Sequence, residues 1–123
     1  MIKLTLDNIV EEIVKLIPEF KDYKDYKVFD IKNESEKRML LSVFGNFLKE
    51  RIDTFPIDDP VIQKTFKLIN EQFNNSDSDQ DVLDYLGIDI FENISPYKKG
   101  MEVSRKLLTG KALESFNETA KYY

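Results

Sequence analysis

The stretch from Asn33 to Phe55 constrains the fold more than any other part of the chain, because it is a long helical pattern with a wide apolar face. Wound at about 100° per residue, its apolar side chains spread over roughly half of the helix circumference. These side chains are Met39, Leu40, Leu41, Val43, Phe44, Phe47, Leu48, Ile52 and Phe55. A face this wide needs cover from more than one neighbour. We therefore expect this helix to lie at the centre of a helical bundle.

Individual residues within this stretch predict how the helix begins, ends and packs. Asn33 precedes Glu36 by three positions, a spacing typical of an N-terminal cap, and Pro56 favours a helix end just before it. Arg51 lies on the apolar face near this end, where we expect its stem to pack and its guanidinium group to reach water. Gly45 lowers helix stability by about 1 kcal/mol relative to alanine. We therefore expect another backbone to approach Gly45 closely.

Further amphipathic segments predict helices on both sides of this one. The first lies within residues 1–17 and ends at Pro18. The residues expected to begin the helices are Thr5 or Asp7, Asp59 with Pro60, Ser76 or Ser78, Ser95 with Pro96, and Lys111 after a break at Thr109 and Gly110. Residues 19–32 predict a short helix or an irregular link. In this link, Tyr23 and Tyr26 are expected to lean on the edge of the core rather than form a contact site.

The helical patterns and short connections together predict the fold class. A chain of 123 residues with 41% hydrophobic content is large enough to bury one core without disulfides or metals. We predict an all-α fold in which residues 1–123 form a single domain of five to six antiparallel helices. A bundle and a short HEAT-like stack of helical hairpins both fit this pattern.

Composition argues against several classes of function. The chain has no Cys and no His, so it lacks thiolate ligands, the commonest general base and the commonest metal ligand. We therefore expect no enzymatic activity, no cofactor and no metal site. The net charge of −5 disfavours nucleic acid as the partner. Because no apolar run reaches the ~20 residues of a membrane span and the N-terminus does not resemble a signal peptide, we expect a cytoplasmic protein.

Specific loop motifs are also missing from the sequence. The acidic run that begins at Asp77 resembles a calcium loop, but its sixth and twelfth positions, which require Gly and Glu, hold Val82 and Ile88. The four glycines are isolated from one another, so a glycine-rich phosphate loop cannot form.

The distribution of charge singles out one segment as the candidate site. Residues 75–94 contain six acidic residues and no Lys or Arg, whereas residues 95–123 carry a net charge of +3. If residues 77–92 form one helix, five acids share an arc of about 140° with a tyrosine and an isoleucine. The predicted partner-binding residues are Asp77, Asp81, Asp84, Tyr85, Ile88, Asp89 and Glu92. Apolar anchors among charges are typical of an interface with a basic protein.

Two other interpretations of this acidic segment stay open. It can be a solvated face, in which Gly87 breaks the helix and lets Ile88 turn inward. Alternatively, the fourth and fifth helices can be neighbours whose opposite charges offset each other within the molecule.

The order of several motifs resembles a known family. These motifs are LIPEF at 16–20, VFGNFL at 43–48, VIQKTFKLINEQF at 61–73, NSDSDQDVLDYL at 75–86 and LLTGKALESF at 107–116. Together they resemble the DUF7674 family of small bacterial all-helical proteins over nearly the whole chain. The resemblance implies a role like that of an immunity protein, which neutralises a secreted toxin, and it assigns no catalytic residues.

The leading hypothesis is therefore a non-enzymatic protein-interaction module, in which the acidic helix covers the active surface of a basic toxin. The alternative is a small helical scaffold or regulatory subunit, homodimeric through Tyr23, Tyr26, Tyr122 and Tyr123, with no toxin partner. A third possibility is an enzyme without histidine, which would need a deep pocket that contains carboxylates of raised pKa. The sequence leaves the oligomeric state open.

Overall fold

The computed structural model describes residues 3–123, and every regular element in this range is helical. The all-α prediction is confirmed. The elements are α1 (Ile9–Leu16), the 3-10 turns η1 (Pro18–Asp22) and η2 (Tyr26–Val28), α2 (Glu34–Thr54), α3 (Pro60–Phe73), α4 (Gln80–Leu86), the π-helical turn η3 (Gly87–Phe91), α5 (Glu92–Ile94), α6 (Lys98–Leu107) and α7 (Gly110–Ala120). Within this range no helix is both long and apolar enough to cross a membrane.

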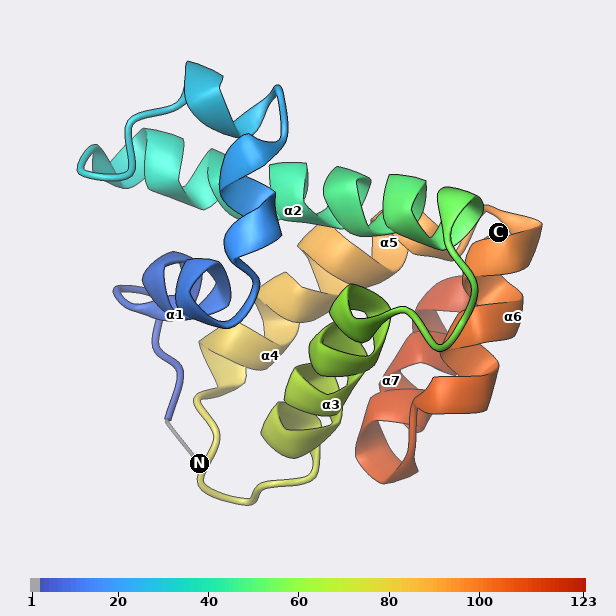
Figure 1. The fold of residues 1–123 in the computed structure, drawn as a ribbon. Helices are drawn as coiled ribbons and strands as arrows, with labels where there is room; N and C mark the ends of the chain where they lie inside the picture. The colour runs from blue at the N-terminus through green and yellow to red at the C-terminus, as the bar shows by residue number, and fades with distance from the viewer. Residues whose placement is uncertain (1–2) are drawn as a thin grey trace.

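Helix α2 is the centre of the domain, as predicted. It lies across the other helices (Figure 1) and contacts α1, α3, η3, α5 and α6. The Asn33 side chain accepts hydrogen bonds from the backbone N–H groups of Ser35 and Glu36, so the predicted cap is confirmed. Met39 departs from the predicted apolar face, because its side chain is 54% exposed. The buried face is therefore narrower at the start of the helix than the sequence pattern predicts.

Gly45 is where α2 meets the π-helical turn η3. A methyl group placed on its Cα would lie 2.1 Å from the backbone oxygen of Asp89 and 2.6 Å from the Asn93 side-chain nitrogen. The predicted close approach of another backbone is thus confirmed. The absence of a side chain at Gly45 lets η3 lie directly against α2.

Arg51 keeps the predicted contact with water only in part, because its side chain is 21% exposed. Its guanidinium group donates two hydrogen bonds of 3.0 Å to the carboxylate of Asp59, which is buried. Asp59 also caps α3 by accepting from the backbone N–H groups of Val61 and Ile62. This carboxylate therefore joins the end of α2 to the start of α3. Sequence spacing predicted the cap but gave no sign of its second partner.

The link between α1 and α2 completes one side of the core. Phe20 of η1 is buried against Phe44 and Phe47 of α2, with ring centroids 5.1 and 5.3 Å apart. Tyr23 and Tyr26 are half-buried beside Phe20. The prediction that both tyrosines lean on the core edge is confirmed. Burial and the neighbouring Glu50 raise the pKa of Tyr23.

Asn70 of α3 and Asn74, the residue that follows this helix, hold the connection between α6 and α7. Asn70 donates to the backbone oxygen of Leu107 and accepts from the N–H of Thr109, both at 2.9 Å. Asn74 donates to the oxygen of Thr109 at 3.1 Å and accepts from the N–H of Lys111 at 2.9 Å. Gly110 adopts φ +53 here, a conformation that favours glycine. The predicted break at Thr109 and Gly110 is confirmed.

Two predicted helix starts are wrong, and a third is confirmed in part. At the first helix, the Thr5 hydroxyl accepts from the N–H of Asn8 at 3.3 Å, as a cap does, although the regular α-helix α1 begins only at Ile9. Ser95 is buried at the end of α5, and α6 begins only after Tyr97. Neither Ser76 nor Ser78 caps α4, as described below.

Candidate functional site

The predicted acidic helix begins later than expected. Asp79 is the N-cap of α4, and its carboxylate accepts from the N–H of Asp81 at 2.9 Å. Ser78 does not cap the helix, since its hydroxyl donates to the backbone oxygen of Gln72. Asp77 lies in the preceding turn, where its N–H donates to the Asn75 side chain. The proposed single helix over 77–92 is therefore wrong at its start, and Asp77 is separate from the helical face.

The second half of this segment changes its helical period. Residues Gly87–Phe91 form the π-helical turn, which has a wider turn than an α-helix and often marks functional sites. The predicted arc of acidic residues assumed a rotation of about 100° per residue over the whole of 77–92. Because the helical period changes, this arc does not hold beyond Leu86. Gly87 does not turn Ile88 inward, because the Ile88 side chain remains 55% exposed. That part of the solvated-face interpretation is wrong.

Two of the predicted partner-binding residues, Tyr85 and Asp89, are half-buried on the side of the segment that meets α2. The guanidinium carbon of Arg38 lies 4.0 Å from the centroid of the Tyr85 ring, which is half-buried. Asp89 is also half-buried next to the close contact at Gly45. The hollow that Tyr85, Asp89 and Arg38 help to line holds about 10 Å³, roughly the space for one water molecule. This hollow has no room for a substrate. The pKa of the Asp89 carboxyl group, which helps to line it, is nevertheless strongly shifted.

Burial raises the pKa of Asp89 from 3.8 to about 6; nearby Arg38 lowers it and Glu92 raises it further. The folded protein thus binds a proton at Asp89 more tightly than the unfolded chain does. We expect the free energy of unfolding of the wild type, measured relative to Asp89→Asn, to fall as the pH rises from 3.8 to about 6.

Urea denaturation of both proteins between pH 3.5 and 7, with NMR titration of the Asp89 carboxyl carbon, measures this difference. Asp84→Asn, which removes an exposed carboxylate of the same segment, is the matched control. A stability difference that does not change with pH would contradict the expected protonation.

The remaining predicted residues form an exposed surface together with α7. Asp81, Asp84, Ile88 and Glu92 are exposed. The Tyr123 hydroxyl donates to Glu92 at 3.1 Å, which places the C-terminal tyrosine beside the acidic segment. Two shallow hollows on this surface share Glu92, Ser115 and Thr119, and together they extend from Ile88 to Tyr122. We call the surface made by Asp81, Asp84, Ile88, Glu92, Tyr122 and Tyr123 the acidic patch.

The acids of this segment are not neutralised within the described part of the molecule. Among residues 3–123, none of the six acids in 75–94 forms an ion pair with Lys or Arg. Helix α6, which carries several of the C-terminal cations, packs mainly against α2, α3 and α7, and it meets the end of the acidic segment where Gly100 lies against the backbone of Ile94. The interpretation in which the fourth and fifth helices offset each other's charge is therefore not supported. Within the same residues, no group of three acidic side chains is placed to hold a metal ion.

Sequence reasoning missed two components of this site. Arg38 belongs to the polar side of α2, and its contact with Tyr85 depends on how α2 crosses η3. Tyr122 and Tyr123 were assigned to a separate apolar surface with Tyr23 and Tyr26, but the structure places Tyr123 on Glu92. Aromatic residues at the end of the chain were the available signal, and only the tertiary fold shows which surface they join.

Comparison of this chain with protein-family models, with curated proteins and with solved structures finds no match. The resemblance to the DUF7674 family therefore stays a prediction, and no relative supplies a function for the acidic patch.

Proposed function

We propose that this protein is a non-enzymatic interaction module, in particular an immunity protein that neutralises a basic toxin by covering the toxin's active surface with the acidic patch. One observation carries the proposal: Asp84 and Glu92, which form no ion pair within residues 3–123, line the same hollow as the exposed side chain of Ile88. We place this function in the cytoplasm of a bacterial cell, in keeping with the family resemblance. A basic protein is the partner that complements this charge.

The apolar side chains of the patch supply the contact area that charges alone lack. Ile88 is 55% exposed, and Tyr122 and Tyr123 are 79% and 59% exposed. Tyrosines and isolated apolar side chains within a polar rim are typical of the contact residues that contribute most to binding. The hollow beside Ile88, which is also lined by Leu83 and Phe73, offers a place for one partner side chain.

The residues of the predicted site take different roles in this proposal. Asp81, Asp84 and Glu92 provide the steering charges, and Ile88 provides an anchor. Tyr85 and Asp89 lie beside Arg38 of α2, and Asp77 lies in the turn before α4.

The acidic patch is tested by reversing two of its charges. Tagged wild-type protein and the variant Asp81→Lys/Asp84→Lys are used to capture partners from the source cell, which mass spectrometry identifies. We expect the wild type to capture a basic protein and the variant to bind it with an association rate at least about tenfold lower, because long-range attraction accelerates such encounters. The same rate should fall for the wild type as salt is raised.

A matched variant tests whether binding depends on the acidic patch itself or only on the net charge of the protein. Glu19→Lys/Asp22→Lys changes the charge equally at exposed positions of η1, and it should bind like the wild type. Equal binding by all three proteins would place the interface elsewhere. If the protein instead self-associates, with a mass that rises with concentration and depends little on salt, the scaffold alternative would replace the immunity proposal.

A further inference from the structure

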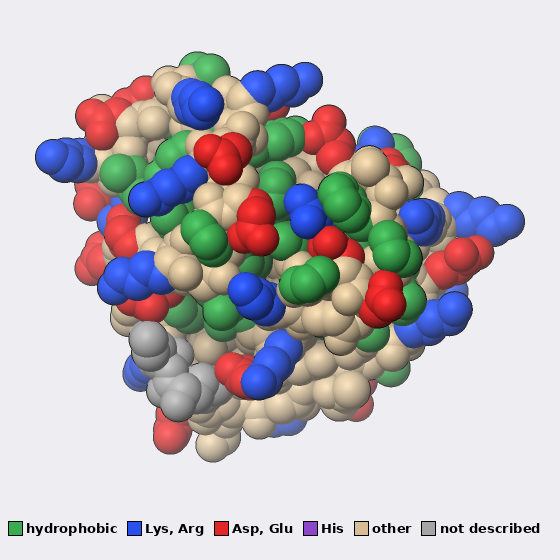
Figure 2. All heavy atoms as spheres, in the orientation of Figure 1, with side chains coloured by type: hydrophobic (Ala, Val, Ile, Leu, Met, Phe, Trp, Pro, Cys, Tyr) green, Lys and Arg blue, Asp and Glu red, His purple; other side chains and the backbone are tan. Residues whose placement is uncertain are grey.

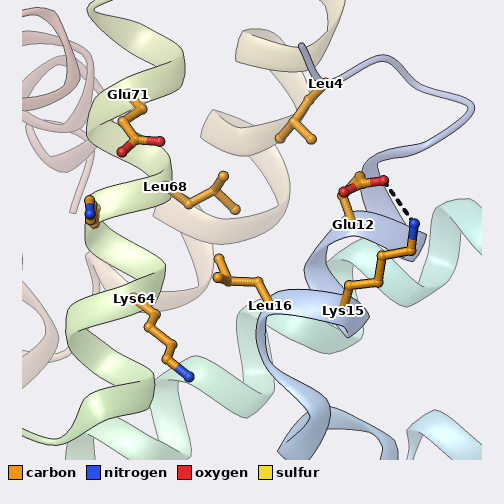
Figure 3. A pocket seen from close by; sticks show the side chains of 8 residues that line it. Leu4, Glu12, Lys15, Leu16, Lys64, Leu68 and Glu71 are labelled. Carbon is orange, nitrogen blue, oxygen red and sulfur yellow. Dashed lines mark hydrogen bonds and ion pairs between the residues drawn. The ribbon is translucent and has the colours of Figure 1, made fainter. Parts of the chain in front are cut away.

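Another hollow lies between α1 and α3 and shares no lining residue with the acidic patch. Its volume is about 490 Å³, within the range of small-molecule sites. The residues that line it are Leu4, Glu12, Lys15, Leu16, Lys64, Lys67, Leu68 and Glu71. They come from the N-terminal segment and from the two helices that Figure 3 shows on either side of the hollow.

Three leucines form the apolar floor of this hollow. Leu16 of α1 and Leu68 of α3 point toward each other across it, with Leu4 beyond them (Figure 3). The sequence pattern predicts that Leu16 is buried with the rest of the apolar face of α1. The structure leaves Leu16 37% exposed, because it faces the hollow instead of the core.

Charged side chains surround the floor, and two of the cations have no ionic partner. Lys15 pairs with Glu12 at 3.4 Å, as Figure 3 shows. Lys64 and Lys67 lie one turn apart on α3, and neither forms an ion pair within residues 3–123. In Figure 2, hydrophobic side chains lie among both basic and acidic side chains on the face that includes α1 and α3. An apolar floor with free lysines at its edge is complementary to an anion that has a hydrocarbon tail.

We propose that this hollow binds a single-chain amphiphile with an anionic head, namely a medium-chain fatty acid. The tail lies on Leu4, Leu16 and Leu68, and the carboxylate meets the ammonium groups of Lys64 and Lys67. Glu71 stands at the same edge and disfavours a ligand with a second negative charge nearby. The size of the hollow suits one short chain rather than a two-chain lipid.

Titration of the full-length protein with decanoate, followed by amide NMR shifts and calorimetry, tests the proposal directly. We expect saturable binding, with the largest shifts around Leu16 and Leu68. The variant Lys64→Gln/Lys67→Gln should bind decanoate about tenfold more weakly, because it removes both free cations. The variant Lys98→Gln/Lys106→Gln removes two cations of α6 that do not line the hollow, and it should bind like the wild type.

Two further measurements keep the test independent of how the lysine variant folds. Leu68→Trp, which should fill the hollow with a larger apolar side chain, is expected to abolish binding while circular dichroism stays helical. Decyltrimethylammonium, which has a tail of similar length and the opposite charge, should bind at least tenfold more weakly than decanoate. Shifts that map elsewhere, equal binding of both amphiphiles, or no saturation by decanoate at millimolar concentration would each overturn the proposal.

Discussion

Replacing Gly45 by alanine should destabilise the protein by about 3 kcal/mol, although alanine is the better helix former. The new methyl group would lie 2.1 Å from the backbone oxygen of Asp89, and a backbone atom cannot move aside without shifting the whole η3 turn. The central helix and the acidic segment must therefore separate or distort. Urea denaturation monitored by circular dichroism measures the change in the free energy of unfolding.

Gly87→Ala is the matched control for this substitution. Gly87 also has helical backbone angles, with φ −63 and ψ −50, but nothing lies within 4 Å of the position its methyl group would take. The same change there should raise stability by about 0.5–1 kcal/mol. If both alanine variants were equally stable, the close contact between α2 and η3 would not exist in solution.

Removing the carboxylate of Asp59 should lower the free energy of unfolding by as much as Gly45→Ala does, or by more. Asp59→Ala leaves the guanidinium group of Arg51, whose side chain is only 21% exposed, without its carboxylate partner and removes the cap of α3. Loss of one partner of a buried ion pair costs about 3–5 kcal/mol, and part of this value here reflects the lost cap. Thermal and urea unfolding of the variant measure the loss.

Two variants separate the contributions to this expected loss. Asp53→Ala breaks the exposed pair with Lys49 on α2 and should change stability by less than about 0.5 kcal/mol. Asp59→Asn keeps a capping oxygen but removes the charge, so its free energy of unfolding should lie between those of the wild type and Asp59→Ala. If Asp59→Ala lowered the free energy of unfolding as little as Asp53→Ala, the pair between Arg51 and Asp59 would not contribute to stability.

The pH dependence of the same pair has a definite sign. The hydrogen bond from Arg51 is the main cause that lowers the pKa of Asp59 below its ordinary value of 3.8. A carboxyl group with a lowered pKa stabilises the folded state above the unfolded pKa, and this contribution disappears as the pH falls through the folded pKa. The stability difference between the wild type and Asp59→Asn should therefore shrink in acid, whereas the difference between the wild type and Asp89→Asn should change in the opposite direction.

Most helices could be predicted from the sequence because their apolar period and their caps agree. The positions of α2 and α3 follow from Asn33, Asp59 and Pro60, whose preferences are local. The start of α4 was wrong because four neighbouring residues, Ser76 to Asp79, can all cap a helix and the fold selects Asp79. The π-helical turn could not be predicted, since nothing in its own sequence reports that the backbone of α2 lies against it.

The candidate site was predictable only as a segment and not as a surface. Its composition correctly singled out residues 75–94 as the most acidic part of the chain. Periodicity could not show that Arg38 stacks on Tyr85 or that Tyr123 reaches Glu92, because these contacts join parts of the chain that are distant in sequence. The hollow between α1 and α3 depends on tertiary packing for the same reason.

The central position of α2 has a consequence for the order of events during synthesis. The apolar face of α2 is covered partly by η3, α5 and α6, which all follow residue 86. A nascent chain that has emerged only as far as the acidic segment therefore still exposes part of that face to solvent, where it is open to aggregation or to a chaperone. The chain can close its core only after η3, α5 and α6 have also emerged from the ribosome.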